Sequence, residues 1–218
     1  LGDVYKRQIY NYTGIMMKIP YYFMLIYFVT SSIVYAGDVD KGKEKSATCV
    51  ACHGNAGISI NPEWPKLAGQ HAKYLETQLY EFQKGPNGSR NNAIMYGIAL
   101  ALSAEDIQDI SAYYASLENS IGLTDDSYLE DGQNIYRGGN MEYKIQACMA
   151  CHGPNGQGNS LAGIPSLSGQ HSEYIYQQLK KFQSTDRAND YNKMMRNIAS
   201  RMSDEEMKAV AKYIEGLY

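Results

Sequence analysis

The chain has 218 residues, a formal net charge of −3 and a calculated pI of about 5.8, with 44% apolar and 20% charged residues. This length predicts one or two domains, and the composition is that of a globular protein. The charge excludes the nucleic-acid-binding class, because such proteins carry a basic stripe and a high pI.

Residues 16–36 are predicted to be a cleavable bacterial export signal. They contain a start with one positive charge at 16–18, an apolar run of about 14 residues, and a small-x-small cleavage site that ends at Ala36. The run is short for a membrane span, which needs roughly 20 apolar residues, so an uncleaved N-terminal anchor is the competing interpretation. Residues 1–15 are interpreted as translated upstream sequence.

The pattern Cys-x-x-Cys-His occurs twice, at residues 49–53 and 148–152. Two thiols one helical turn apart can add to the two vinyl groups of a haem, and the adjoining His can turn its imidazole onto the iron. We therefore predict two covalently bound haem c groups. The candidate residues, which include every cysteine of the chain, are Cys49, Cys52, His53, Cys148, Cys151 and His152.

Other uses of paired cysteines fit this chain less well. A single Cys-x-x-Cys-His pentad is compatible with a redox dithiol or with half of a zinc site. The two pairs stand about 100 residues apart, which suits two separate sites better than one tetrahedral zinc cage. A disulfide within Cys-x-x-Cys closes too small a loop to stabilise the fold much. The export signal indicates an oxidising compartment, and the pentads indicate thioether bonds there.

The rest of the chain is one unit written twice. The segment Pro-Lys-Leu-Ala-Gly-Gln-His at 65–71 returns 100 residues later as Pro-Ser-Leu-Ser-Gly-Gln-His at 165–171. Two such units predict two similar domains, residues 37–120 and 121–218. A polar segment at 119–127, which has no helical stripe, is the predicted connection.

Each unit is predicted to contain helices and loops, so the predicted fold class is all-α. Apolar residues at helical spacing predict a helix over 73–82 and a counterpart in the second unit. Closing helices are predicted to begin at Ser103 and Ser203, each with a capping-box sequence, weaker in the first unit where Asp takes the place of Glu. Shorter helices are expected from residue 42 to the first pentad and over about 128–136. No stretch alternates strictly enough to predict a strand.

The second axial position on each iron decides between electron transfer and ligand chemistry. Among the Met residues after the signal segment, only Met95 has a Met at the equivalent place of the other unit, Met195. Both lie eight residues before the Ser that begins the closing helix. We predict these two as distal ligands, and we interpret Met194 and Met202, which align with Ile and Leu, as packing residues.

Two other axial arrangements stay open. His71 and His171 are repeated as well, and they are the remaining imidazoles of the chain. Each follows Gly-Gln at the start of a predicted helix, where a capping or surface role is the simpler explanation. An open or displaceable position at one haem is the third arrangement, and it would admit small ligands.

With these marks the chain resembles the dihaem cytochrome c4 family, in which two class I cytochrome c domains stand in tandem. The resemblance covers about residues 38–218 and rests on the pentads, the Pro-x-Leu-x-Gly-Gln segments, the paired Met positions and the Tyr-rich ends of the closing helices. It implies that the four Cys anchor the haems and that the haem edges of the two domains lie close. The axial ligands that it implies are His53 and His152 on the proximal side and Met95 and Met195 on the distal side.

The resemblance also implies an electron carrier and not an enzyme. The expected protein is a periplasmic shuttle of a respiratory chain, loosely associated with the membrane. It would take electrons from a quinol-oxidising complex or another donor and pass them to a haem-copper terminal oxidase. A similar tandem dihaem chain serves as the electron-accepting subunit of a flavin-containing sulfide dehydrogenase, which is the first alternative. A dihaem peroxidase, which would need one open haem, is the second.

Overall fold

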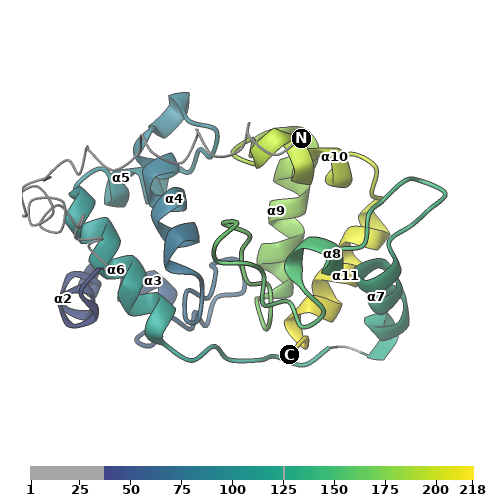
Figure 1. Ribbon diagram of the computed structural model, residues 1–218, viewed down its shortest axis with the longest axis horizontal. Helices are drawn as coiled ribbons and strands as arrows, with labels where there is room; N and C mark the ends of the chain where they lie inside the picture. The colour runs from purple at the N-terminus through teal and green to yellow at the C-terminus, as the bar shows by residue number, and fades with distance from the viewer. Residues whose placement is uncertain (1–36, 125) are drawn as a thin grey trace, which may run out of the picture. The chain divides into compact units, whose positions relative to one another are not determined.

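The computed structural model describes residues 37–124 and 126–218, and its regular structure is helical (Figure 1). The predicted export signal at 16–36 and residues 1–15 lie outside the described part. That part contains no strand and only three isolated β-bridges. None of its helices is long and apolar enough to cross a membrane. The predicted all-α fold class is confirmed.

Each repeat supplies its own series of helices. The first contains α2 (Val39–Lys45), α3 (Ala47–His53), α4 (Ala72–Gln83), the 3₁₀ helix η1 (Gly85–Asn87), α5 (Ala93–Ala99) and α6 (Ala104–Ser116). The second contains α7 (Asp126–Gly138), α8 (Met149–His152), α9 (Ser172–Ser184), the 3₁₀ helix η2 (Tyr191–Lys193), α10 (Met194–Ala199) and α11 (Asp204–Glu215).

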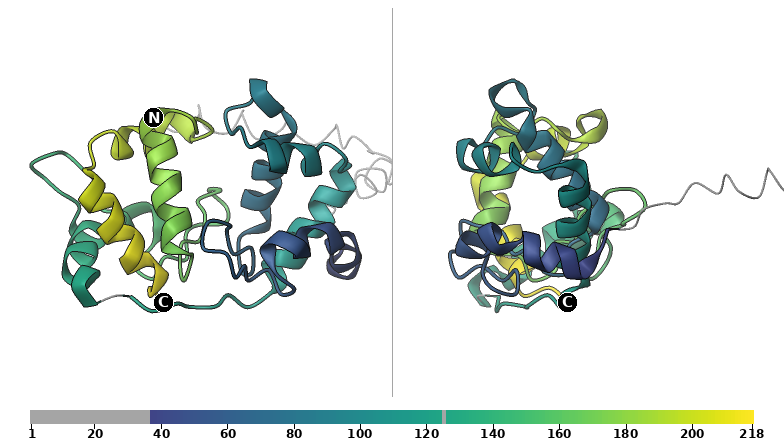
Figure 2. Two further views of the ribbon diagram at one scale, coloured as in Figure 1. Left: turned by 180° about the vertical axis from the view of Figure 1, so that it is seen from behind. Right: turned by 90° about the vertical axis from the view of Figure 1, so that its left-hand side faces the viewer.

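The left view of Figure 2 shows the helices of the first repeat and those of the second as two groups side by side, as Figure 1 does. All described residues belong to one compact unit. The connection after α6 is extended and lies against the second repeat, where Gly122 N–H donates to the carbonyl oxygen of Glu215 at 2.9 Å. The Gln70 side chain of the first group also donates to the carbonyl oxygen of Ser166 in the second at 2.9 Å, so the groups are joined by packing as well as by the chain.

Most predicted helices are present with small changes at their ends, but the one expected from residue 42 to the first pentad is two helices, α2 and α3, separated at Ser46. The helix predicted over 73–82 is α4, and the closing helices α6 and α11 begin directly after Ser103 and Ser203. The capping box of α6 is as complete as that of α11, because the carboxylate of Asp106 accepts from Ser103 N–H at 3.0 Å while the Ser103 hydroxyl accepts from Asp106 N–H at 3.1 Å. Such a cap stabilises a helix by about 1 kcal/mol.

The first and the closing helix of each repeat cross at a glycine. A Cβ atom on Gly42 of α2 would lie 2.0 Å from the carbonyl oxygen of Asp109 in α6, and one on Gly132 of α7 would lie 2.4 Å from that of Ala209 in α11. No side chain fits at such separations, so glycine lets the two backbones touch. This contact fixes the helix pair that stands beside each pentad.

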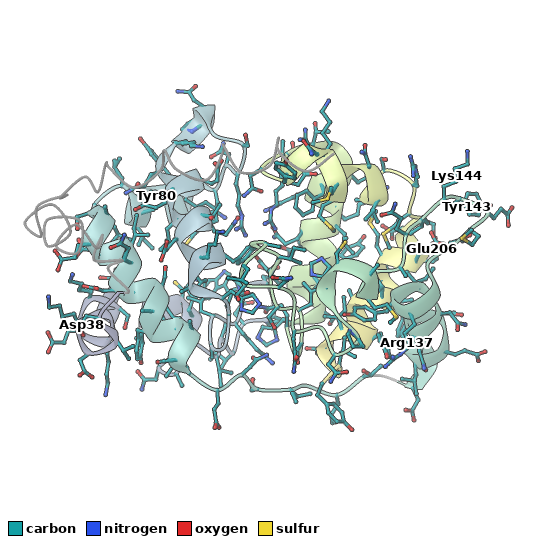
Figure 3. The ribbon with its side chains drawn as sticks, viewed as in Figure 1. Asp38, Tyr80, Arg137, Tyr143, Lys144 and Glu206 are labelled. Atoms are coloured by element: carbon teal, nitrogen blue, oxygen red, sulfur yellow. The ribbon has the colours of Figure 1, made fainter. Side chains whose placement is uncertain are left out.

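Polar anchors complete these helix pairs at positions labelled in Figure 3. Asp38 caps α2 by accepting from the backbone N–H groups of residues 40 and 41, and its own N–H donates to the buried carboxylate of Asp109 at 2.7 Å. In the second repeat Glu206 belongs to the capping box of α11 and also accepts from the side chain of Asn140 at 2.8 Å. Arg137 of α7 donates to the hydroxyl of Tyr213 at 3.1 Å.

Candidate haem-binding site

One cavity of about 680 Å³ is lined by both repeats. Its volume is within the range of cofactor sites, roughly 300–1,000 Å³. Every residue predicted from the sequence to bind haem or iron lines this cavity. These residues are Cys49, Cys52, His53, Met95, Cys148, Cys151, His152 and Met195.

The two pentad histidines are buried and oriented by backbone carbonyls. His53 Nδ1 lies 2.9 Å from the carbonyl oxygen of Pro65, and His152 Nδ1 lies 3.0 Å from that of Pro165. A carbonyl oxygen only accepts, so Nδ1 carries the proton in both rings and Nε2 keeps its lone pair. Burial lowers the pKa of both imidazoles, although the carbonyl partners act in the opposite direction. Both rings are thus held in the neutral form that binds metals.

A glycine ends the helix directly after each Cys-x-x-Cys-His pentad. Gly54 has φ of 78° and Gly153 has φ of 79°, a left-handed backbone that lets each chain turn away directly after the histidine. All four thiols are free in the structure. Burial raises the pKa of the Cys49 thiol and raises that of Cys148 to about 11. A redox dithiol requires the opposite shift, so this alternative is disfavoured.

A zinc centre is disfavoured as well. Within residues 37–124 and 126–218, no three side chains of His, Cys, Asp or Glu are grouped closely enough to hold a metal ion. Structural zinc is held by four such ligands in a tetrahedron. The two cysteine pairs therefore serve separate sites.

Met95 is placed by a short helix, α5, that the apolar pattern of the sequence did not predict. The side chain of Asn92 caps this helix by accepting from Met95 N–H at 3.0 Å. At its other end, the Gln83 side chain of α4 donates to the carbonyl oxygens of Ala99 and Leu102 at 2.9 and 2.8 Å. These contacts tie the end of α5 and the turn that follows it to α4.

Met195 is placed by α10 in a similar way. Gln183 of α9 donates to the carbonyl oxygens of Ala199 and Met202 at 3.2 and 3.1 Å. Neither glutamine was predicted to have a role, although Gln83 and Gln183 stand at the same 100-residue offset as the methionines. That shared offset is the signal that could have found them.

The remaining methionines behave differently from one another. Met202 is 4% exposed and belongs to the core of the second repeat, which agrees with its interpretation as a packing residue. Met194 is 45% exposed and, like its counterpart Ile94, lines the cavity, so its interpretation as a packing residue stays a prediction.

The repeated histidines outside the pentads contact the opposite repeat. His71 Nε2 lies 2.8 Å from the carbonyl oxygen of Gln157, and His171 Nε2 lies 2.7 Å from that of Ser59. Neither ring lines the cavity. Because carbonyl oxygens only accept, each Nε2 donates a proton and has no lone pair to offer a metal.

A pair of buried arginines joins the repeats within the cavity wall. Arg90 is 8% exposed and donates to the hydroxyl of Tyr174 at 2.7 Å, while Arg187 is 6% exposed and donates to the hydroxyl of Tyr74 at 2.9 Å. Among the described residues, no carboxylate lies within ion-pair distance of either guanidinium. Burial would raise the pKa of Tyr74, but the two arginines outweigh it and lower that pKa.

This donor set fits a haem in each repeat. Paired thiols, a neutral imidazole and a thioether line the cavity on each side, and a haem uses these three kinds of group for attachment and axial ligation. The two guanidinium groups are cations that would meet the propionate carboxylates of a haem. In addition, the hydroxyl of Tyr114, which lines the cavity, is buried with no hydrogen-bond partner among the described residues.

Comparisons with known proteins agree with this site. The cytochrome c family model matches residues 39–118 and 129–217. The chain is 39% identical over 210 residues to cytochrome c4 of Stutzerimonas stutzeri, which covers 93% of this chain and 100% of the relative. It is similar to the crystal structure of reduced recombinant cytochrome c4 from Pseudomonas stutzeri, with a TM-score of 0.81, 40% identity, and coverage of 84% of this chain and 100% of that one.

A second kind of relative is more distant. The chain is 35% identical over 175 residues to the thiosulfate dehydrogenase electron acceptor of Thiomonas intermedia, which covers 78% of each chain.

Proposed function

The chain belongs to the cytochrome c4 family of dihaem electron carriers, and from this premise we propose that it is a periplasmic shuttle of a respiratory chain. Its two Cys-x-x-Cys-His motifs bind two haem c groups covalently. In this proposal residues 37–120 and 121–218 are its two haem domains. The axial ligands are His53 and Met95 in the first and His152 and Met195 in the second.

One observation carries the ligand assignment. A single cavity contains both pentad histidines with Nε2 free, together with both paired methionines, whereas the rings of the rival histidines His71 and His171 are engaged by carbonyls outside it. A thioether is a soft ligand that favours Fe(II) and raises the reduction potential. A His/Met pair in each repeat therefore suits a carrier that accepts electrons and passes them on.

The residues around each site keep both ligands in place. When bound, each haem supplies an iron that changes between Fe(II) and Fe(III). The Pro65 and Pro165 carbonyls fix the orientation of the imidazoles, and Gln83 and Gln183 fix the methionine helices against α4 and α9. Because neither ligand has to move, little reorganisation accompanies the change in charge.

The finer assignment has its own support. The periplasmic location follows from the export signal predicted at 16–36, and loose membrane association follows from the resemblance to the family. A quinol-oxidising complex as donor and a haem-copper terminal oxidase as acceptor are the partners that this role requires. To test the acceptor, the reduced protein is mixed with membranes that contain the terminal oxidase, and the rate at which the protein is oxidised is measured.

A second candidate function has a specific observation in its favour. The relative from Thiomonas intermedia is named as the electron acceptor of thiosulfate dehydrogenase. Acceptance of electrons from a dehydrogenase of sulfur compounds is therefore the alternative, and it is close to the sulfide dehydrogenase subunit considered from the sequence. Reduction of the oxidised protein by such a dehydrogenase, faster than by a quinol-oxidising complex, would favour it. A peroxidase is disfavoured, because both repeats place a Met equally.

The ligand assignment is tested by absorption spectroscopy of the oxidised holoprotein. Met-sulfur ligation of Fe(III) gives a weak far-red charge-transfer band. We expect a band for two such haems, loss of half of it in Met95→Ala and in Met195→Ala, and no loss in His71→Ala. A half-sized band in the unchanged protein would contradict the assignment for one repeat.

A further inference from the structure

We propose that Gln70 and Gln170 are positioning residues, each of which tunes the proximal imidazole of the opposite repeat through one peptide bond. The inference rests on the proposed ligation of iron by His53 and His152. It assigns a role to the repeated Gly-Gln-His segments, which the ligand set leaves unexplained.

Each glutamine clamps the residue that follows a proline in the other repeat. Gln170 Oε1 accepts from the backbone N–H of Lys66 at 2.9 Å, and its Nε2 donates to the carbonyl oxygen of Lys66 at 2.9 Å. Gln70 holds Ser166 in the same way, at 3.0 and 2.9 Å. The backbone partners fix which end of each amide is oxygen, because N–H only donates and C=O only accepts. Both glutamines are buried, at 8% and 7% exposure.

The clamped N–H groups belong to the peptide bonds that hold the ligand histidines. The amide that ends in Lys66 N–H begins with the Pro65 carbonyl, and that carbonyl accepts from His53 Nδ1 at 2.9 Å. A continuous path therefore runs from the imidazole N–H, through one peptide group, to the carboxamide oxygen of Gln170.

The second path is the mirror of the first. His152 Nδ1 donates to the Pro165 carbonyl at 3.0 Å, and the N–H of the same peptide group, which belongs to Ser166, donates to Gln70 Oε1. Each repeat thus supplies the last acceptor for the other.

Hydrogen bonds arranged in such a series strengthen one another. An acceptor on the N–H side of a peptide group polarises the amide, so its carbonyl oxygen becomes more negative and accepts more strongly, by roughly 10–30% per bond. A stronger bond to Nδ1–H makes the imidazole a more basic ligand. A more basic ligand favours Fe(III). Each glutamine therefore lowers the reduction potential of the haem in the opposite repeat.

The rest of the Gly-Gln-His segment holds the glutamine in place. Gln170 Oε1 also accepts from the backbone N–H of His171 at 3.0 Å, and the ring of His171 donates to the carbonyl of Ser59 in the first repeat. Gly169 has φ of 66°, and a Cβ atom on it would lie 2.4 Å from the carbonyl oxygen of Ser120. The glycine permits the approach, the backbone N–H of His171 holds the carboxamide oxygen, and the ring of His171 makes a separate contact with the first repeat.

The experiment compares Gln170→Met with Gln70→Met in the holoprotein. Methionine keeps the length of the side chain and removes the strong acceptor without adding charge. The reduction of each haem is followed separately by an NMR-monitored redox titration, with haem signals assigned through contacts to residues of their own repeat.

The expected result is crossed. Gln170→Met makes the haem bound at Cys49 and Cys52 about threefold easier to reduce, which is about 28 mV at 59 mV per tenfold for one electron, and leaves the other haem unchanged. Gln70→Met makes the haem bound at Cys148 and Cys151 easier to reduce by a similar factor and leaves the first haem unchanged. Equal shifts of both haems in each variant, a shift of the haem in the substituted repeat, or no shift would overturn the proposal.

Matched controls separate tuning from loosening of the interface. His71→Ala and His171→Ala each remove a hydrogen bond between the repeats without touching either peptide group, so the potentials should stay in place. The same crossed shifts in these variants would contradict the proposal. If Gln170→Met does not hold both haems, Gln170→Asn replaces it in the experiment. Its side chain is polar but one methylene too short to reach Lys66, so the same crossed shift is expected.

One further measurement distinguishes a failure of the proposed iron ligation from a failure of the proposed tuning. In the reduced holoprotein, the imidazole protons of an iron ligand are shifted strongly by the haem ring current. If those signals belong to residues other than His53 and His152, the ligand assignment fails. If they belong to these two and the potentials do not cross, only the tuning fails.

Discussion

In the first repeat a buried carboxylate joins the first helix to the closing helix, whereas the equivalent position of the closing helix in the second repeat is apolar. Asp109 of α6 is fully buried, accepts from Asp38 N–H at 2.7 Å and pairs with Lys45 at 2.7 Å. Its counterpart in α11 is Ala209, and there Met207 and Val210 supply the core. The helix pairs beside the two proposed haem sites thus differ at this position, with a polar contact in the first repeat and an apolar one in the second. We expect the two pairs to respond differently to substitution and to pH.

The proximal sides differ as well. Lys66 stands after Pro65, and its buried ammonium donates to the carbonyl oxygens of Gly169 and Ser120 at 2.7 and 3.0 Å. The second repeat has Ser166 at this place, whose hydroxyl reaches only Gly156 within its own repeat, at 3.3 Å. The residue after the proline therefore carries a buried positive charge in the first repeat and a neutral hydroxyl in the second.

Gly42→Ala and Gly132→Ala should be the most damaging changes to either support. Each added methyl group would meet backbone of the closing helix, so the helix pair must separate, at a cost of about 3 kcal/mol in the free energy of unfolding. Denaturant unfolding followed by haem absorption measures this cost. Gly138→Ala in α7 is the matched control, because nothing lies near its Cβ position, and a small gain is expected there. Similar losses at Gly138 would contradict the crossing argument.

Asp109→Asn should break the polar support and spare the apolar one. The amide keeps the shape of the side chain but loses its charge, so Lys45 loses its buried partner, at a cost of about 2 kcal/mol in the free energy of unfolding. The exposed pair of Asp204 with Lys208 provides the control, since solvent screens it and Asp204→Asn is expected to cost less than Asp109→Asn. An equal cost for both substitutions would show that burial of Asp109 is unimportant.

Acid should weaken the first repeat through the same cluster. Hydrogen bonds from Lys45 and Ser103 lower the pKa of Asp106 from 3.8 to about 2, and Lys45 lowers the pKa of Asp109 against the effect of burial. Carboxylates with a lowered folded-state pKa stabilise the fold above their unfolded value, and this contribution is lost as the pH falls from about 4 toward 2. Unfolding measured across this window should show a smaller pH dependence in Asp109→Asn. An unchanged pH dependence would mean that other groups control acid stability.

Lys66→Met should remove the charge asymmetry between the proximal sides. A buried cation favours the less positive Fe(II) form, so its loss should make the first haem about threefold harder to reduce by a Coulomb interaction across the interior. The haem-by-haem redox titration detects the change. Lys73→Met is the control in the same repeat. The ammonium of Lys73 donates to the Leu161 carbonyl at an exposed position, so its loss should shift the potential less. A larger effect at Lys73 would contradict the assignment.

The smallest difference concerns the loops that lead into the methionine helices. Asn92 caps α5 with its side chain, whereas its counterpart Asn192 has a left-handed backbone with φ of 49°. Asn192→Gly should therefore raise the free energy of unfolding by about 0.5 kcal/mol, while Asn92→Ala should lower it by about 1 kcal/mol. Thermal unfolding of the two variants checks the signs. A loss in Asn192→Gly would show that this backbone is not strained.

The sequence was most informative where the signal is local or repeated. The pentads, the capping boxes and the apolar faces of α4, α6 and α11 depend on neighbours within a few residues, so their patterns predicted the helices directly. The short helices α5 and α10 were missed, because contacts from Gln83 and Gln183 hold them rather than an apolar stripe. Their methionines were still predicted, since the repeat aligned them.

The role of the Gly-Gln-His segments could not be predicted for a different reason. Their periodicity was visible, but the partners of Gln70 and His71 are backbone groups of the other repeat. A single sequence contains no sign of which backbone group lies across an interface. The same holds for Arg90 and Arg187, whose hydroxyl partners come from opposite repeats.

The two buried guanidinium groups also bear on how firmly the repeats are joined. Arg90 and Arg187 pair where the repeats meet, and the described residues give neither of them a carboxylate. Removing two like charges from water without an anion costs several kcal/mol each, so this junction carries an electrostatic cost that its hydroxyl partners offset only in part. An anionic group bound at that place would therefore tighten the join between the repeats.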